Sequence, residues 1–447
     1  MKYTPPKKIA EAARQLDFSQ PLEYNDPRYV DTEKGRGALD YNQLYKKMGF
    51  DLSTYPDVSL PESGHTLFCG HIGCGKSTEL RRLSRDLNKS ELFYVVFIDV
   101  EEELDPNNLQ YPDLLMSLAK KLLEKLGKDN IEIGSVYLTS LQSWFKEITI
   151  KSETTKSIAS ELNAGVEAKV DIPLLIKIFS KLTNSLKIGS AYKKELREVI
   201  KHFFTDFANA FHSLIGVVER ETEKRLLGRR VLFIVDGTDK MSREDGVRFF
   251  IEDSNQLKCI RANFLYCTPI HLFYTENQVQ QRFKHFILPM IKIAGKDGTK
   301  NKECYEIMRE IVLRRADISL FETPGTFENP GIIDKVIEYS GGSPRELMKI
   351  LENAYLFAKD KFTEETIMNG IDKLVVEYKR MLAFKDSTYF KLMVDIDSGI
   401  AVDMGSEKVE YLLFNLVLFE YNEYWWKSHP VVRRLEGYQM ALKAKED

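Results

Sequence analysis

Residues 65–77 read HTLFCGHIGCGKS, and this stretch decides the fold. Its first five residues form a short apolar run typical of a buried strand, and the glycine that follows ends it. The rest fits G-x-x-x-x-G-K-[ST], a glycine-rich loop between a strand and a helix. The loop and helix start comprise Gly70, His71, Ile72, Gly73, Cys74, Gly75, Lys76, Ser77 and Thr78. Leucines at 80, 83 and 87 recur at helical spacing, so strand, loop and helix are all predicted.

These residue types bind phosphate groups for a physical reason. Glycines leave the backbone N–H groups free to converge on an anion, and the helix N-terminus adds partial positive charge. Lys76 can reach the β- and γ-phosphates of a nucleotide, and the Ser77 hydroxyl can hold Mg²⁺. The pattern arises by chance in about 1–2% of chains of this length, given average residue usage. We therefore predict that residues 70–78 bind a nucleotide; the alternative is a plain glycine-rich turn.

An apolar strand that ends in an acid complements the loop. Residues 229–236 read RRVLFIVD. A nucleotide-bound Mg²⁺ needs a carboxylate on a neighbouring strand, so Asp236 is predicted on the metal side, against a solvated strand-end Asp. Hydrolysis also needs a group that polarises the attacking water. Gly237 follows directly, so the next acid, Asp239, is the candidate base, against a solvated loop carboxylate. Slow hydrolysis, or use of the nucleotide mainly as a switch, stays open.

The remaining apolar runs define the fold class. Strands are predicted at 65–69, 94–100, 231–235, 264–267 and 286–289, and helices alternate with them. Strands that are apolar on both faces indicate an α/β fold with a mostly parallel five-stranded sheet, covered by helices on both sides. About 130 residues separate the second and third strands, so a helical insertion is predicted at about 127–227. It includes a long helix at roughly 193–226, which packs on the core or, alternatively, binds a partner as a coiled coil.

Length and composition exclude several classes of protein. The 447 residues favour about three domains, and 43% hydrophobic with 29% charged residues is a globular profile. Lys and Arg number 64 against 67 Asp and Glu, so the chain is not a polycation that captures nucleic acid or anionic lipid. No apolar run of about 18 residues occurs, and residues 1–20 lack the apolar block of a signal peptide. The five cysteines form no CxxC pair, so we expect neither a disulfide scaffold nor a zinc module, but a cytoplasmic protein without membrane contact.

GHIGCGKST at 70–78 and VLFIVDGTDK at 231–240 together resemble the additional-strand P-loop ATPases, the group of AAA+, STAND and KAP-type proteins. The DGTDK stretch is similar to the D-D-L-D-R element of KAP-type ATPases, with Gly237 in place of the second acid. The long connection between the second and third strands suits this group better than a small kinase. The resemblance covers residues 60–435 and implies ATP and Mg²⁺ as cofactors.

The resemblance also implies roles for four residues outside the two motifs. Thr268, at the end of the fourth strand, is similar to the polar residue that serves such ATPases as a sensor. The alternative is a threonine that merely ends the strand in a turn. Arg282 precedes the fifth strand, where AAA+ proteins have an arginine that reaches the γ-phosphate bound by a neighbouring subunit. The alternative is a surface arginine, because STAND relatives often lack such an arginine finger. Arg345, in GGSPREL at 341–347, is similar to the arginine of the lid motif G-x-P-R-x-L, against a solvated first-turn arginine. Arg36, between two glycines, resembles an element that lies near the adenine in STAND and origin-recognition ATPases, against a surface turn.

Residues 383–435 resemble a winged helix, in which helices precede a hairpin of 416–421 and 424–426 around Asn422-Glu423. A DNA-binding version needs basic or amide side chains on its second helix. The candidate helix at 406–413 instead bears Glu407 and Glu410 against Lys408, and residues 381–447 hold 8 Lys and Arg against 11 Asp and Glu. DNA contact is therefore disfavoured. STAND proteins use such a unit as an internal clamp on the ATPase. In this chain, Trp425 and Trp426 are expected to dock the unit onto its own ATPase core.

The sequence thus predicts an N-terminal segment at 1–60, an ATPase core at 61–300 with its insertion, a helical lid at 301–380 and a winged-helix-like unit at 381–447. The expected function is an ATP-binding and ATP-hydrolysing switch of the bacterial AAA+/STAND type. The resemblance implies a homo-oligomer, a separate effector or regulator protein, and a role in antiphage defence. The alternatives are a DNA-associated ATPase that resembles origin-recognition loaders, and a P-loop kinase, which needs neither the lid arginine nor the C-terminal unit.

Overall fold

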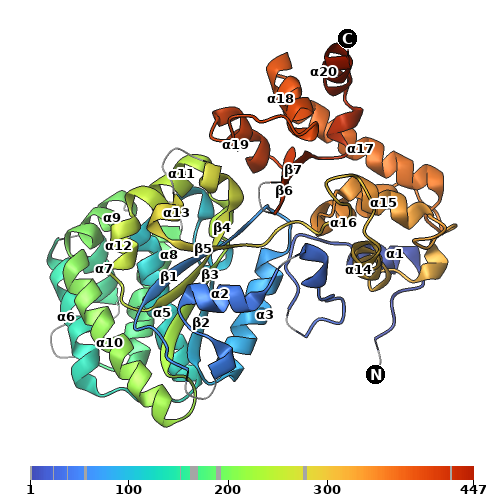
Figure 1. The fold of residues 1–447 in the computed structure, drawn as a ribbon. Helices are drawn as coiled ribbons and strands as arrows, with labels where there is room; N and C mark the ends of the chain where they lie inside the picture. Colours follow the sequence, from blue (N-terminus) through green and yellow to red (C-terminus); the bar gives the residue numbers. More distant parts are fainter. Residues whose placement is uncertain are drawn as a thin grey trace.

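The computed structural model describes residues 3–23, 25–37, 39–54, 58–151, 153–161, 170–187, 193–274, 279–422 and 425–446. At its centre lies a sheet in the strand order β2-β3-β4-β1-β5, in which every neighbouring pair is parallel (Figure 1). The strands are β1 (Gly64–Gly70), β2 (Phe93–Asp99), β3 (Arg230–Asp236), β4 (Asn263–Pro269) and β5 (Lys284–Ile287). The predicted α/β class with a five-stranded parallel sheet is confirmed.

Parallel pairing brings the carboxyl ends of the strands to one edge of the sheet, where α/β proteins bind ligands. The register pairs Asp99 with Asp236 and Cys69 with Thr268. Only β4 separates β1, which leads into the glycine-rich loop, from β3, which ends in the acid. The order of the strands therefore brings the two sequence motifs together at this edge. β5 begins two residues earlier than predicted, because residues 284–287 pair with 66–69 of β1.

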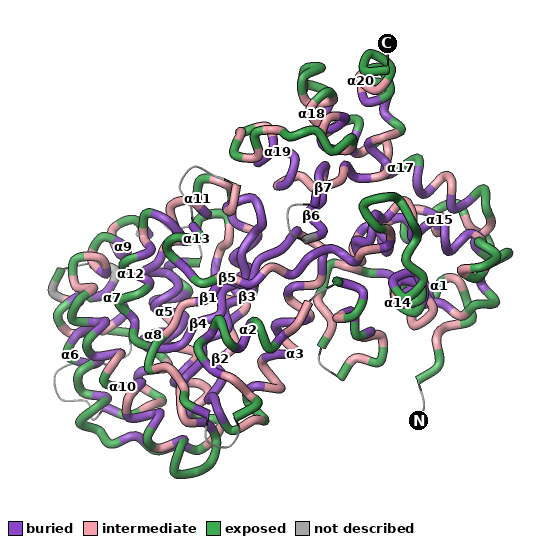
Figure 2. Tube along the Cα trace, viewed as in Figure 1, coloured by how far each residue is buried: buried purple, intermediate pink, exposed green. Residues whose placement is uncertain are grey.

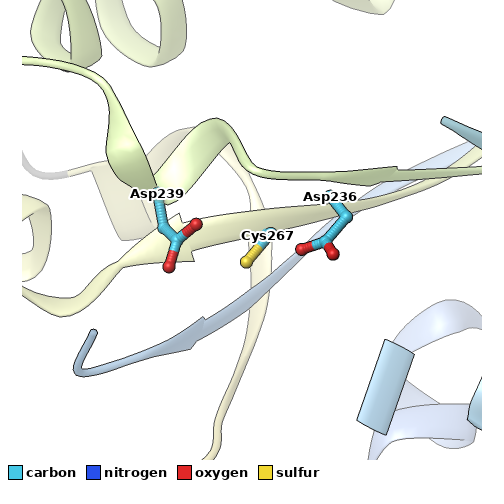
Figure 3. A group of neighbouring side chains, drawn as sticks. All are labelled: Asp236, Asp239 and Cys267. Atoms are coloured by element: carbon cyan, nitrogen blue, oxygen red, sulfur yellow. The ribbon is translucent and has the colours of Figure 1, made fainter. Parts of the chain in front are cut away.

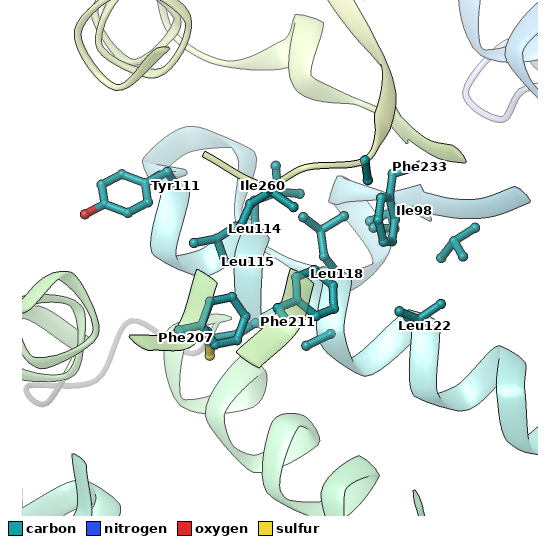
Figure 4. Close-up of a cluster of buried hydrophobic side chains, with 14 of the residues drawn as sticks. Ile98, Tyr111, Leu114, Leu115, Leu118, Leu122, Phe207, Phe211, Phe233 and Ile260 are labelled. Carbon is teal, nitrogen blue, oxygen red and sulfur yellow. The ribbon is translucent and has the colours of Figure 1, made fainter. Parts of the chain in front are cut away.

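The connection between β2 and β3 forms a layer of helices against the sheet. Its helices are α5 (Tyr111–Lys128), α6 (Ser135–Lys151), α7 (Glu153–Glu161), α8 (Ile172–Lys187), α9 (Lys193–His202) and α10 (Phe204–Lys224). Leu114, Leu118 and Leu122 recur every fourth residue on α5, so they lie on one face of that helix. They share a buried core with Phe207 and Phe211 of α10 (Figure 4).

The single long helix predicted at 193–226 is wrong, because the segment forms two helices that meet at Phe203. Phe203 has φ −100° and ψ 23°, outside the helical region, and its carbonyl oxygen accepts a hydrogen bond of 3.1 Å from the Trp144 indole. Both helices bury an apolar face, so the hydrophobic period continues across the break. Periodicity alone therefore could not show it.

The opposite face of the sheet is covered by α2 (Tyr41–Met48) and α3 (Lys76–Lys89), which share a second core with the strands. The chain reaches α2 through α1 (Ile9–Gln15) and an irregular segment. Val30 of this segment is buried in a third core together with α1 and helices from the second half of the chain. The N-terminal segment therefore joins the sheet body to the C-terminal half of the molecule.

The C-terminal half consists of a helical part and a unit with a hairpin. The helical part contains α14 (Lys302–Leu313), α15 (Ile332–Ser340), α16 (Pro344–Tyr355) and α17 (Glu364–Leu382). The last unit contains α18 (Ser387–Asp397), α19 (Glu407–Phe414), β6 (Leu418–Asn422), β7 (Trp425–Ser428) and α20 (Glu436–Glu446). The two parts share the third core.

The predicted hairpin is present, with Glu423 and Tyr424 outside the described residues; the winged-helix assignment itself stays a prediction. The hairpin lies between the sheet body and the helical part (Figure 1), and its tube is mostly buried (Figure 2). Among the described helices, none combines the length and the apolar character needed to cross a bilayer.

Candidate functional site

The glycine-rich loop joins β1 to α3 and closes tightly on its neighbours. Gly73 and Gly75 have φ of +82° and +103°, a left-handed backbone that glycine adopts without strain. A Cβ on Gly73 would lie 2.5 Å from Cβ of Arg345. Glycine at this position therefore serves both the turn and the close approach of α16.

Lys76 is buried, with only 3% of its surface exposed, and its ammonium group is bound within the chain. Nζ donates to the carbonyl oxygens of Gly70 at 2.9 Å and His71 at 2.7 Å, and pairs with Asp239 Oδ2 at 2.8 Å. Burial alone would lower the pKa of Lys76, but the Asp239 carboxylate outweighs it and holds the pKa above its ordinary value. Burial would likewise raise the pKa of Asp239, and the Lys76 ammonium holds it below its ordinary value. Both groups are therefore charged, and each neutralises the other.

Ser77 and Asp236 lie side by side next to this ion pair. Ser77 Oγ donates to Asp236 Oδ1 at 2.9 Å, and the Gly237 N–H donates to the same oxygen at 2.9 Å. Burial, assisted by the nearby Asp239, raises the pKa of Asp236 to about 6. A hydroxyl and a carboxylate are the oxygen donors that Mg²⁺ prefers, and a cation there would keep Asp236 ionised. The residues present fit the metal ion that the motif implies.

Asp236 and Asp239 flank a third side chain, Cys267 of β4 (Figure 3). One ligand atom from each of the three lies within 4.8 Å of the others. Burial, together with the two carboxylates, raises the pKa of the Cys267 thiol well above its ordinary value, so the thiol stays protonated. A protonated thiol is not a metal ligand, and the oxygen atoms are the relevant donors. Sequence reasoning missed Cys267, since no motif singles out this position.

Arg36 lies beneath the glycine-rich loop. Only 2% of its surface is exposed, so the alternative of a surface turn is wrong. Its guanidinium donates to the carbonyl oxygen of Cys74 at 2.6 Å, to Thr32 Oγ1 at 2.9 Å and to the carbonyl oxygen of Pro289. The arginine therefore supports the loop backbone from the N-terminal segment.

A cavity of about 160 Å³ extends from the loop toward the N-terminal segment. Its lining includes residues 72–79 of the loop and α3, residues 17–22 and 28–30 of the N-terminal segment, Arg36, Asp239 and Lys240, Ile311 and Arg315, and Pro344, Arg345 and Met348. Leu22 N–H donates to Thr78 Oγ1 at 3.2 Å, which fixes the segment against α3. Val30, Ile311 and Met348 are apolar members of the lining and belong to the third core. Sequence reasoning missed these contributors, which no motif connects to the loop.

The structure brings Arg345 to the loop, whereas Thr268 and Arg282, like Asp236, Gly70 and His71, do not line the cavity. Arg345 N–H donates to the Gly73 carbonyl at 3.3 Å, and its guanidinium lies 5.8 Å from the centre of the Phe18 ring. Thr268 is buried in β4, and its hydroxyl donates to the Tyr266 carbonyl at 3.3 Å. Arg282 ends α13 (Val279–Arg282) before β5, and Nη1 donates to Ser254 Oγ at 3.2 Å.

The C-terminal hairpin touches the glycine-rich loop directly. Glu420 N–H of β6 donates to His71 Nε2 at 2.8 Å. Burial, together with the Lys76 charge, lowers the pKa of His71 to about 3, so the ring is neutral and Nε2 can accept. On the next residue, the Tyr421 hydroxyl donates to the carbonyl of Gly341 at 2.8 Å, just before α16. One strand therefore contacts both the loop and the start of the lid helix.

Further contacts fix the unit to the sheet body. Arg243 Nε, just after the Asp236–Asp239 turn, donates to Glu410 Oε1 of α19 at 2.8 Å, and Nη2 binds the other oxygen. The Trp426 indole donates to the Tyr274 hydroxyl at 3.1 Å. Trp426 therefore contributes to the docking of the C-terminal unit on the sheet body, as expected. Glu410 contributes as well, although the sequence analysis used it only as an argument against DNA binding.

Comparison with known proteins gives neighbours of low similarity. No family model matches the chain, and no curated protein matches its sequence. Among solved structures, a Walker-type ATPase of Pyrococcus abyssi is 12% identical and has a TM-score of 0.40, with 96% of this chain and 99% of that one covered. The Drosophila origin recognition complex bound to DNA is 12% identical, with a TM-score of 0.38 and coverages of 92% and 78%. The Orc1 protein of Aeropyrum pernix in complex with DNA is 12% identical, with a TM-score of 0.35 and coverages of 97% and 96%. At this similarity, what these proteins bind says nothing about what this chain binds.

Proposed function

We propose that this chain is an ATP-binding and ATP-hydrolysing molecular switch of the AAA+/STAND type. One observation carries the proposal. The lysine of the G-x-x-x-x-G-K-S loop is buried against Asp239, beside the Ser77–Asp236 pair, while the lid helix and the C-terminal hairpin both contact the same loop. The groups that would bind phosphate therefore lie next to the lid helix and the hairpin, the two parts that move in this proposal.

The residues of the loop have distinct parts in this mechanism. Lys76 exchanges Asp239 for the β- and γ-phosphates of ATP, to which the loop N–H groups also donate. Ser77 and Asp236 would hold Mg²⁺, which would offset the negative charge of the phosphates. Asp239, once released from Lys76, accepts a proton from the attacking water. Because the ion pair must open first, we expect slow turnover.

The switch follows from the contacts around the loop. The cavity of about 160 Å³ is smaller than usual ligand pockets, so we expect ATP binding to move the N-terminal segment or α16, both of which line it. Arg345 turns toward the γ-phosphate, and the hairpin leaves His71. A ligand shifts such an equilibrium only through different affinity for the two states, and the Lys76–Asp239 pair supplies that difference.

Finer features belong to the same proposal. The four parts at 1–60, 61–300, 301–380 and 381–447 act as units, with 381–447 as the clamp. Thr268 senses the nucleotide from β4, and Arg282 acts on the nucleotide of a neighbouring copy in a homo-oligomer. A separate effector protein in the cytoplasm of a bacterium would carry the signal, for example in antiphage defence.

Hydrogen exchange of residues 411–435 with and without ATP–Mg²⁺ tests the switch on the full chain. Exchange should be slow without ATP and faster with it in the wild type, while Arg345→Ala should bind ATP but show no such change. Lys349→Ala, one turn further along α16, is the matched control and should behave as the wild type. Exchange that is unaffected by bound ATP would contradict the clamp.

Two further measurements distinguish the alternatives. ATPase activity that duplex DNA stimulates several-fold would favour the DNA-associated ATPase. Transfer of labelled γ-phosphate to a small acceptor rather than to water would favour the kinase. The acidic C-terminal unit and the Arg243–Glu410 pair speak for the switch.

A further inference from the structure

A second cavity, of about 430 Å³, lies beside the hairpin and has none of the glycine-rich loop in its lining. The loop at 293–300, the end of α15 and the β6–β7 hairpin enclose it. Its side chains include three tyrosines, one tryptophan and four cations: Tyr305, Tyr339, Tyr421, Trp425, Lys296, Lys300, Lys427 and Arg433. This volume falls in the range of pockets that hold small organic ligands.

The cavity has an excess of positive charge, with Glu338 as the only acid among its lining residues. Lys300 pairs with Glu338, and Arg433 Nε lies 3.1 Å from an oxygen of Asp397. Lys427 Nζ donates to a main-chain carbonyl rather than to a carboxylate. Lys296 is exposed and has no ion pair within the described part of the chain. Two of the four cations therefore remain without a neutralising carboxylate.

Trp425 supplies an unused hydrogen-bond donor in the same wall. Only 8% of its surface is exposed, and Nε1 has no hydrogen-bond partner among the described residues. The Tyr421 ring stacks on it, with the ring centres 4.7 Å apart. A buried indole N–H without an acceptor is costly, and an oxygen atom of a ligand would remove that cost.

We propose that this cavity binds a small organic anion with a planar ring. Its carboxylate or phosphate oxygen lies near Lys296 and Lys427, its ring packs on the tyrosines, and a small turn of the Trp425 ring brings the buried N–H within reach of the same oxygen. Charge-assisted hydrogen bonds of this kind are stronger than those between neutral groups.

The position of the cavity also makes the ligand a regulator, a step that rests on the proposed function. Tyr421 and Gly341 both line the cavity and are joined by the hydrogen bond before α16. The residue before Tyr421 donates to His71 of the glycine-rich loop. A ligand that holds the hairpin in place therefore stabilises the state in which the hairpin contacts the glycine-rich loop. ATP binding breaks that contact under the proposed function, so it opposes binding of the ligand.

The site itself is tested with anilinonaphthalene sulfonate, a planar aromatic anion whose fluorescence reports binding, on the full chain without nucleotide. Trp425→Phe, which keeps a ring and removes the N–H, and Lys296→Glu should each weaken binding about tenfold. Lys443→Glu on α20 is the matched control and should not change the affinity. Equal affinity in all variants would place the probe elsewhere and overturn the site. Competition by phenyl phosphate and by benzoate distinguishes the two anion chemistries.

The coupling is tested by repeating the titration with saturating ATPγS and Mg²⁺. The wild type should bind the probe about fivefold more weakly, because coupling between two sites is reciprocal, and Tyr421→Phe should reduce the change. Unchanged probe affinity in a chain that demonstrably binds ATPγS would overturn the coupling. A chain that does not bind ATPγS at all would instead contradict the proposed function and leave the titration without nucleotide as the test of the cavity.

Discussion

Two of the buried ion pairs in the described part of the chain differ in their surroundings. In the helical insertion, Arg197 Nε donates to Asp113 Oδ1 at 2.9 Å, and its other nitrogens bind Asp113 Oδ2 and the side chain and carbonyl of Asn108. In the glycine-rich loop, Lys76 pairs with Asp239 at 2.8 Å and otherwise binds only carbonyls of its own loop. Both pairs are almost completely removed from water.

The difference separates a structural pair from an exchangeable one. The planar guanidinium of Arg197 uses all its nitrogens on partners from two elements, so no ligand can replace them without breaking the packing. The Lys76 ammonium is a compact charge, and a phosphate oxygen can take the place of the Asp239 carboxylate as its anionic partner.

Arg197→Ala should have the largest effect, and only on stability. It leaves Asp113 buried without its partner, which costs about 3–5 kcal/mol of unfolding free energy. Chemical denaturation measures this cost. Arg220→Ala, an exposed arginine of α10, is the control, and ATP affinity of the folded Arg197→Ala chain should stay within twofold of the wild type.

Lys76→Ala should abolish detectable ATP binding, because the phosphates lose the only cation of the loop. We expect the dissociation constant to rise at least ~100-fold, about 2.7 kcal/mol at room temperature. Titration with a fluorescent ATP analogue measures it, with Lys89→Ala at the end of the same helix as control. Affinity near that of the wild type would remove the nucleotide-site assignment.

Asp239→Asn should bind ATP at least as tightly as the wild type but hydrolyse it about 100-fold more slowly. The amide no longer competes as an anion for Lys76, and it cannot accept the proton from water. Steady-state turnover and equilibrium binding give the two quantities, with Lys89→Ala as control. Normal turnover in Asp239→Asn would show that the base lies elsewhere.

The contact between His71 and the hairpin should depend on pH. The pKa of His71 in the folded protein is about 3, below the ordinary value near 6.5. Because the folded state favours the neutral ring, the stabilising contribution of His71 is present above pH 6.5 and is lost as the pH falls toward 3. The loss amounts to at most about 1.4 kcal/mol per pH unit. The wild type should therefore lose stability between pH 6.5 and 5 faster than His71→Gln, which cannot titrate. Parallel curves for the two chains would contradict this assignment.

Local patterns explain why much of the fold and part of the site could be predicted. The loop motif, the acid at the end of β3 and the apolar strands each lie within about ten consecutive residues, so short-range chemistry identifies them. The break at Phe203 was not predicted, because it coincides with a hydrogen bond from the distant Trp144, which no local pattern indicates. Cys267 escaped because its significance comes only from lying beside Asp236 and Asp239.

The sequence alone identified the α/β class and the glycine-rich loop, and it assigned Ser77 and Asp236 to one Mg²⁺, because each of these features lies in a local motif. Only the tertiary structure decided that Arg36 supports the loop, that Asp239 neutralises Lys76, and that Glu420 reaches His71 across a separation of 349 residues. The physical reason is that burial and long-range hydrogen bonds depend on how distant segments pack. A residue pattern records the chemistry of each segment, whereas its partner is fixed only when the chain has folded.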